Sequence, residues 1–88
     1  MAEARSMLAR FFELPEEILL DLPKVTLLGD VQVLIENHRG LELFRPERIT
    51  VRTASGRLTV GGRNLRVGAV DRESVVLTGE ISSIAFGG

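Results

Sequence analysis

The chain has 88 residues, with eleven basic and twelve acidic side chains, a net charge of −1 and no cysteine. This length supports one small domain, the lack of cysteine excludes disulfides and thiolate metal sites, and the balanced charge does not favour a nucleic-acid binder. No apolar run approaches the length of a transmembrane helix and no signal peptide is recognisable, so we expect a cytoplasmic protein that at most touches a membrane peripherally.

Residues 1–22 are predicted to form one or two short helices. Apolar residues recur there at helical spacing, and polar residues occupy the opposite face. Pro15 suits the first turn of a second helix, and Pro23 ends it. The apolar stripe consists of Ala4, Met7, Leu8, Phe11 and Phe12. We therefore divide the chain into a helical segment, residues 1–22, and a β domain, residues 23–88.

From Lys24 onward the apolar residues alternate with polar ones, which is typical of half-buried strands. The pattern apolar-x-apolar-x-Gly occurs three times, ending at Gly29, Gly62 and Gly79, and a fourth copy ends at Arg45-Pro46. A second apolar pair follows each of these marker positions. Each unit is therefore predicted to be one long strand that bends at its marker, where glycine or proline permits the bend.

Four such strands joined by short polar turns predict an all-β, antiparallel meander that folds over into a half-open roll. A short parallel β-solenoid is the alternative, because markers 16 or 17 residues apart could stack in register. The short turns favour the meander. Its first strand, Val25–Glu36, and its last, Val75–Phe86, would each leave one edge unpaired, which predicts a homo-oligomer built through sheet edges, with head-to-tail pairing of first strand to last.

His38, the only histidine, lies in the segment ENHRG between the first two units. Asn37 and Gly40 suit the positive φ of a turn. A catalytic histidine needs positioned partners, but the sequence has no G-x-S-x-G motif and no paired carboxylates at useful spacing. We therefore predict a turn rather than an active site, no enzymatic activity, no cofactor and no metal site. On this interpretation His38→Ala leaves folding nearly intact, and replacing Gly40 is more damaging.

The Gly-rich segment 60–64 lacks the strand-to-helix transition that a phosphate-binding loop needs, so a glycine bend is expected there. Arginines at outward positions instead predict a face for an acidic partner or anionic lipid, with a solvated sheet surface as the plain alternative. The arginines proposed for this face are Arg48, Arg52 and Arg66, with Arg57 and Arg63 nearby in the pattern.

Three apolar residues, Leu28, Leu34 and Val76, fall on the face opposite the main alternation and need a cover. The stripe of Met7, Leu8, Phe11 and Phe12 could supply it by docking on its own sheet. The same stripe could instead bind a membrane surface or a partner helix.

Several segments carry a resemblance to a known family: residues 22–26 (LPKVT), 35–40 (IENHRG), the alternating run 56–65 and residues 78–81 (TGEI). Through them Leu22–Phe86 resembles the YabP/YqfC family of sporulation proteins, and its YqfC branch in particular. The resemblance implies a non-enzymatic protein that acts in the mother cell of an endospore-forming bacterium, with no catalytic residues to carry over. It also implies the membrane-bound sporulation protein YqfD as a partner.

Two functions are compatible with these observations. The first is a self-associating scaffold or an adaptor for a membrane partner. The second is a module that binds a small ligand or a lipid. A filled interior would favour the first, and a hydrophobic cleft between the two layers of the roll would favour the second.

Overall fold

The computed structural model describes residues 21–87, which form a single antiparallel sheet of six strands. The strands are β1 (Lys24–Leu28), β2 (Gln32–Glu36), β3 (His38–Arg45), β4 (Arg48–Thr53), β5 (Gly56–Val70) and β6 (Ser74–Gly87). Their order in the sheet is β1-β2-β6-β5-β4-β3. The predicted all-β class is confirmed, and because every pair is antiparallel the solenoid alternative is wrong.

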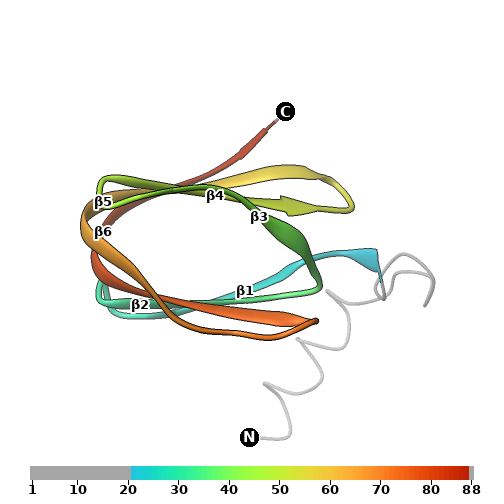
Figure 1. The fold of residues 1–88 in the computed structure, drawn as a ribbon, viewed down its shortest axis with the longest axis horizontal. Coiled ribbons are helices and arrows are strands. Elements are labelled where there is room, and N and C mark those ends of the chain that lie inside the picture. Colours follow the sequence, from blue (N-terminus) through green and yellow to red (C-terminus); the bar gives the residue numbers. More distant parts are fainter. Residues whose placement is uncertain (1–20, 88) are drawn as a thin grey trace, which may run out of the picture.

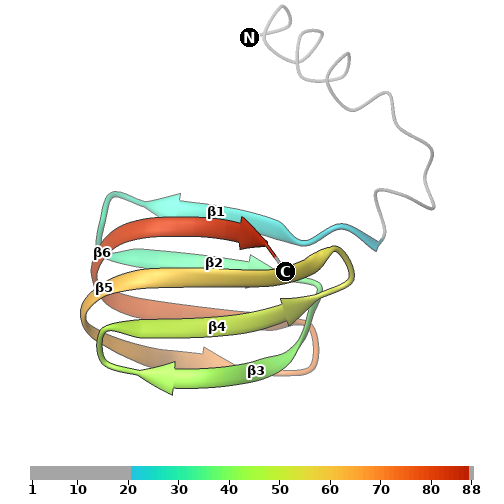
Figure 2. The ribbon, with the colours of Figure 1, turned by 90° about the horizontal axis from the view of Figure 1, so that it is seen from above.

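The sheet folds over on itself because β5 and β6 are long enough to run through two layers (Figure 1). β4 pairs with the first half of β5, up to Gly61, whereas β2 pairs with the first half of β6, up to Thr78. The upper layer therefore contains β3, β4, the first half of β5 and the second half of β6. The lower layer contains β1, β2 and the remaining halves of β5 and β6 (Figures 1 and 2). The predicted roll is present.

The prediction of four bent strands needs correction, because only the last two units are single strands. At Gly29 the chain reverses instead of bending: Gly29 has a φ of 54°, and the Val31 amide donates to the Leu28 carbonyl at 3.2 Å to close a turn between β1 and β2. The marker at Arg45-Pro46 is likewise followed by a turn, between β3 and β4. Four units thus give six strands.

Each of these two turns packs against one bend of the long strands. The β1–β2 turn accepts amide hydrogen bonds from β6, with Gly79 donating to the Val31 carbonyl at 3.1 Å. The β3–β4 turn accepts them from β5, with Leu65 donating to the Pro46 carbonyl at 2.8 Å. The marker positions of the repeat therefore meet in pairs: the turn at Gly29 contacts the bend at Gly79, and the turn at Arg45-Pro46 contacts the bend at Gly62.

Close backbone approach explains the glycines at the bends. A Cβ on Gly62 would collide with the carbonyl oxygen of Glu80, and a Cβ on Gly79 would lie 2.6 Å from the carbonyl oxygen of Asn64. Gly79 also has a φ of 138°, which L-residues rarely adopt. β5 and β6 can therefore bend side by side only because Gly62 and Gly79 have no side chains at these close contacts.

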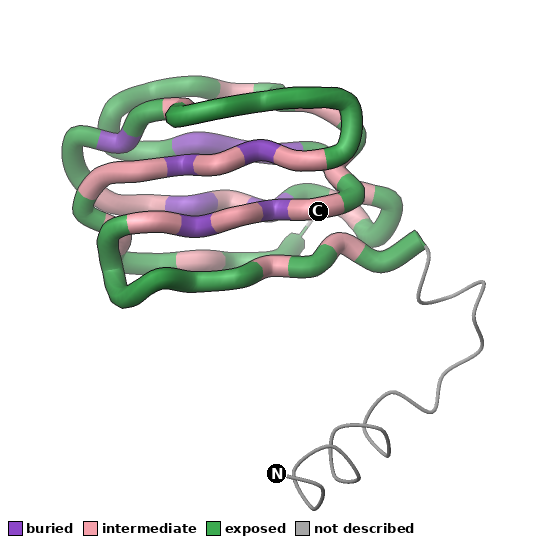
Figure 3. The backbone as a smooth tube through the Cα atoms, turned by 90° about the horizontal axis from the view of Figure 1, so that it is seen from below, coloured by how far each residue is buried: buried purple, intermediate pink, exposed green. Residues whose placement is uncertain are grey.

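Aliphatic side chains from the inward faces of both layers form one buried core. The buried positions lie on strands of both layers (Figure 3). These residues are 0–1% exposed: Val33, Ile35, Ile49, Val51, Leu58, Val60, Leu65, Val75 and Leu77. All of them occupy apolar positions of the predicted alternation. Full burial of such a side chain stabilises a fold by about 1.5–3 kcal/mol, so this cluster is the main source of stability.

The expected edges are partly paired within the chain. β2 lies in the predicted first strand, and it pairs with the segment Val75–Thr78 of the predicted last strand. What stays unpaired is the outer side of β1 and the second half of β6.

The helical segment predicted for residues 1–22, including Met7, Leu8, Phe11 and Phe12, lies outside the described residues apart from Asp21 and Leu22. Residues 21–87 contain no helix long and apolar enough to cross a membrane.

Candidate interaction surfaces

His38 joins two corners of the roll. It begins β3, directly after Asn37, whose φ of 65° turns the chain out of β2. Its Nδ1 accepts the Gly40 amide at 3.0 Å, and its Nε2 lies 2.8 Å from the carbonyl oxygen of Asp71 in the β5–β6 turn. A carbonyl can only accept, so the Nε2 carries the proton and the ring is neutral in this arrangement. The predicted positive φ of Gly40 is confirmed at 122°.

The same corner holds a second set of hydrogen bonds. The Asn37 amide donates to the Glu73 carbonyl at 2.7 Å, and the Asn37 side chain donates to the Leu22 carbonyl at 3.0 Å. The segment IENHRG is therefore a turn, as predicted, but one whose side chains tie the start of the sheet to the β5–β6 turn. His38 is half-buried rather than an exposed tip, so its loss should cost more stability than the sequence indicates.

The Asp71 side chain stabilises the β5–β6 turn through hydrogen bonds to the backbone of the turn. Its Oδ1 accepts the amides of Ser74 at 2.7 Å and Glu73 at 2.9 Å. These amides, that of Ser74 foremost, lower the pKa of the Asp71 carboxyl. Among residues 21–87, no group of three or more histidine, cysteine or acidic side chains is placed to hold a metal ion.

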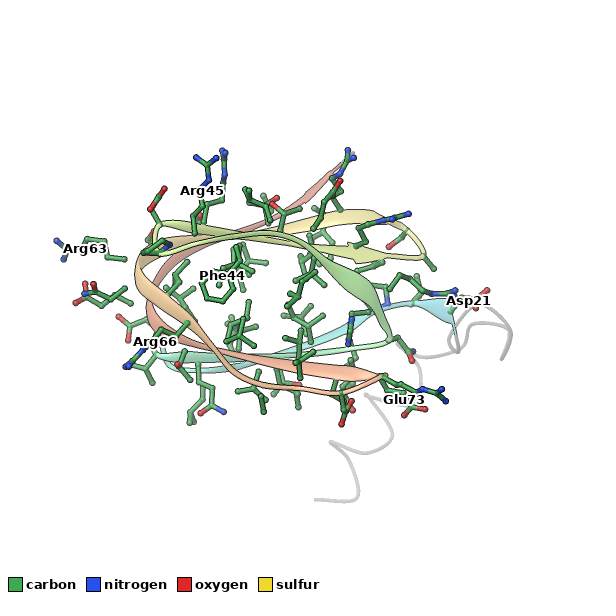
Figure 4. The ribbon with its side chains drawn as sticks, viewed as in Figure 1. Asp21, Phe44, Arg45, Arg63, Arg66 and Glu73 are labelled. Carbon is green, nitrogen blue, oxygen red and sulfur yellow. The ribbon has the colours of Figure 1, made fainter. Side chains whose placement is uncertain are left out.

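Arg48 and Arg52 lie together on the outer face of the upper layer, because they alternate along β4 with the buried Ile49 and Val51. Arg45, the cross-strand partner of Arg48, also points away from the upper layer (Figure 4). We call Arg45, Arg48, Arg52 and Arg57 the arginine face. It borders a shallow hollow of about 340 Å³ that includes Glu42, Arg48 and Arg57 in its lining.

Glu42 neutralises only part of this charge. Its carboxylate forms a two-point contact with the Arg57 guanidinium, at 2.5 and 2.9 Å. The Arg57 hydrogen bond lowers the pKa of the Glu42 carboxyl, and the charge of Arg52 contributes to the same effect. The arginine face therefore keeps a net positive charge.

Arg66 does not belong to the arginine face. It pairs with Thr78 on the outer face of the lower layer, and Figure 4 shows it on the opposite side of the molecule from Arg45. Arg63 lies at the bend of β5, where it forms an ion pair with Glu80 at 2.9 Å. The sequence pattern found outward positions correctly but could not assign them to a layer.

Leu28, Leu34 and Val76 lie on the outer face of the lower layer, as their place in the alternation predicted. Leu34 pairs directly with Val76, and both are half-buried, whereas Leu28 is 64% exposed. Whether the N-terminal stripe covers them stays a prediction.

Sequence reasoning missed the two open sides of the roll. The first open side lies between β1 and the second half of β6, and the second lies between β3 and the second half of β5 (Figures 1 and 2). Apolar residues on the inward face reach solvent there: Leu27 and Phe86 on the first side are 54% and 66% exposed, and Phe44 on the second is 52% exposed (Figure 4). Their exposure follows from the strand order, which the alternation cannot specify, and Phe44 faces inward only because of the register shifts in β3.

Comparison with known proteins places the chain in a family. The profile of the YabP family matches residues 21–88, which include every strand. The chain belongs to the YabP family. The uncharacterized protein YqfC of Bacillus subtilis (strain 168) is a similar sequence, 32% identical over 82 residues, which are 93% of this chain and 88% of that protein. No solved structure matches the chain.

Proposed function

We propose that this YabP-family chain is a non-enzymatic sporulation protein that acts in the mother cell of an endospore-forming bacterium. In this proposal it is a self-associating scaffold or an adaptor for a membrane partner, with YqfD as the expected partner. The observation that carries the proposal is the pair of open sides, where sheet edges and inward-facing apolar side chains such as Phe86 and Phe44 reach solvent. Surfaces of this kind bind another chain through backbone hydrogen bonds and apolar contact.

Two further observations support an interaction role over a catalytic one. Both ring nitrogens of His38 are engaged with the backbone, which is what a structural histidine does. The interior is filled by aliphatic side chains, and the hollow between the layers at the first open side measures about 220 Å³, below the range of typical ligand sites, about 300–1,000 Å³.

The experiment that tests the proposal replaces the coding sequence of the Bacillus subtilis relative with that of this chain. Heat-resistant spores are then counted against strains that carry the native gene or a deletion. We expect a sporulation defect in the deletion strain and its relief by this chain. Normal spore counts after deletion, or a defect that a folded and abundant chain does not relieve at all, would contradict the proposed role.

One observation favours a second candidate, a lipid-binding module. The arginine face has a net positive charge and contains guanidinium groups suited to phosphate oxygens. Anionic headgroups are the ligand that this surface fits best. Vesicle binding, described in the Discussion, separates this candidate from the first.

A further inference from the structure

The folded-over sheet exposes four stretches of strand that have a ladder partner on one side only, within the part of the chain that the structure describes. They are β1, β3, the second half of β5 and the second half of β6. Proteins usually protect such edges with charges, prolines or bulges. β1 begins with Lys24 after Pro23, β3 carries two register shifts and three charged residues, and the second half of β5 contains Arg66 between register shifts.

The second half of β6, Ile81–Gly87, has none of these protections beyond the bulge at its start. Its sequence ISSIAFG contains no charge and no proline, and Ser83–Gly87 pair with β5 in an unbroken register. When an antiparallel strand pairs with its own copy across a two-fold axis, the residue on the axis faces its own copy, so a charge there would face a like charge. This edge is therefore the one best suited to pairing with its own copy.

The hydrogen-bonding groups that face outward can be assigned. The Gly62 amide donates to the Glu47 carbonyl in the β3–β4 turn, so it points away from β6. Amide directions alternate from one residue to the next along a strand. Thr59 lies three residues before Gly62, so its amide points to the opposite side, toward its partner Ala85 on β6. Ala85 is thus bonded to β5, and the amides and carbonyls of Ile84 and Phe86 are directed to the open side.

We infer that a second copy of this chain adds to β6 in antiparallel fashion across a two-fold axis at Ala85. This inference rests on the self-association in the proposed function and specifies its geometry. In this register Ala85 faces Ala85 of the copy, and each Ile84 faces a Phe86. The outward-directed groups of Ile84 and Phe86 then bond to each other in both directions. Each upper layer continues into the next, which forms one sheet across the dimer.

Side-chain packing supports the same register. Ile84 and Phe86 pair with Val60 and Leu58, which are buried, so both side chains point to the interior face. Phe86 is 66% exposed because no strand flanks it at the first open side. A hollow at the same open side is lined by Leu27, Ile81 and Ile84, among other residues. The Ile84–Phe86 contacts across the axis would cover these side chains with apolar surface instead of water.

A charge-swap experiment at Ala85 tests this register. Ala85 is exposed on the outer face, so a larger side chain there fits without disturbing the core. Ala85→Lys and Ala85→Glu each place like charges opposite one another at the axis. We expect each variant alone to dimerise at least about tenfold more weakly than the wild type. An equimolar mixture should regain dimerisation, because the introduced lysine of one copy then faces the introduced glutamate of the other. Sedimentation velocity across a concentration series measures this, and circular dichroism checks retained β content.

Leu43→Lys is the matched control, since it adds the same charge to the outer face of the upper layer at its other edge, β3. It should leave dimerisation unchanged. A wild-type chain that stays monomeric at every concentration would contradict both the proposed self-association and this inference. Association that is insensitive to charge at Ala85, that the mixture fails to restore, or that Leu43→Lys abolishes would overturn the β6 interface while leaving a self-associating scaffold intact.

Discussion

At the scale of single residues, polar side chains in this fold act mainly on the turns. His38 and Asp71 lie in different turns, and a hydrogen bond from the His38 ring to the Asp71 backbone links them. Asp71 in turn organises the amides of its own turn. His38, the residue that most resembled a catalytic group, therefore links two turns. We expect its substitution to lower stability rather than to remove a chemical activity.

His38→Ala removes two hydrogen bonds to the backbone. Each such bond contributes about 0.5–1.5 kcal/mol, so we expect the free energy of unfolding to fall by about 1–3 kcal/mol in urea titrations at neutral pH. Spore formation in the replacement strain should persist. A variant that keeps wild-type stability and abundance yet yields no heat-resistant spores would mean that His38 has a chemical role after all.

Gly40 tests the backbone at the same corner. Its φ of 122° lies in a region that other residues rarely adopt, although an added Cβ would meet no atom within 4 Å. Gly40→Ala should therefore lower the free energy of unfolding through backbone strain alone, by about 1–3 kcal/mol. A loss smaller than that of His38→Ala would contradict the expectation that the backbone matters most here.

Asp71 makes the stability of the fold depend on pH in the acidic range. Amide hydrogen bonds hold the pKa of its carboxyl below the unfolded value of about 3.9. Its contribution is therefore present above the unfolded pKa and is lost as the pH falls through the folded pKa. Wild type should exceed Asp71→Asn in stability at neutral pH, and the difference should shrink toward about pH 2. Asp30→Asn, which removes one carboxylate from the β1–β2 turn, controls for net charge; an Asp71→Asn gap that stays constant with pH would refute this.

At the scale of elements, the bends of β5 and β6 decide the architecture. Straight strands of that length would give one flat sheet with one apolar face open to water. Gly62 and Gly79 allow the two strands to bend together, so both halves of the sheet bury their apolar faces against each other. The turns β1–β2 and β3–β4 then bond to the bends and fix them in place.

Gly62→Ala should destabilise the fold by about 1–3 kcal/mol, because the new Cβ would overlap the Glu80 carbonyl and only a backbone shift could relieve it. Gly68→Ala is the matched control on the same strand, since its Cβ would meet its nearest neighbours at an ordinary 3.6 Å. Thermal unfolding of both variants measures the difference. Equal melting temperatures would show that the bend tolerates a side chain.

At the scale of the whole molecule, the two layers carry different outer faces. The upper layer presents the arginine face, whereas the lower layer presents Leu28, Leu34 and Val76. A membrane-facing role for the upper layer would use its charge, and a docked segment would use the apolar face of the lower one. The open sides lie along the strand edges between the layers, so binding there would not require either outer face.

Arg48→Glu combined with Arg52→Glu tests the upper face directly. If it binds lipid headgroups, the wild type should co-sediment with vesicles containing anionic phosphatidylserine, and the double variant should bind at least about tenfold more weakly. Arg66→Glu, on the lower layer, is the matched control and should bind like the wild type. Binding that is absent at low salt, or that Arg66→Glu weakens equally, would remove the lipid-binding candidate.

The sequence by itself determined the fold class, the fully buried residues and the positions at which the chain turns or bends. It wrongly placed Leu43 on the inward face with Leu41, because it could not foresee the register shifts in β3 that turn Leu43 outward. The strict alternation of apolar residues specifies which side chains face the core, and all of the fully buried residues lie at those positions. It could not decide that Gly29 reverses the chain while Gly62 only bends it, because both geometries call for the same small residue at the same place in the repeat. Nor could it choose the partner of each strand, since an alternating strand fits any neighbour that shares its face. Tertiary structure made that choice by pairing β2 with β6, and this pairing set which edges and which arginines meet solvent together.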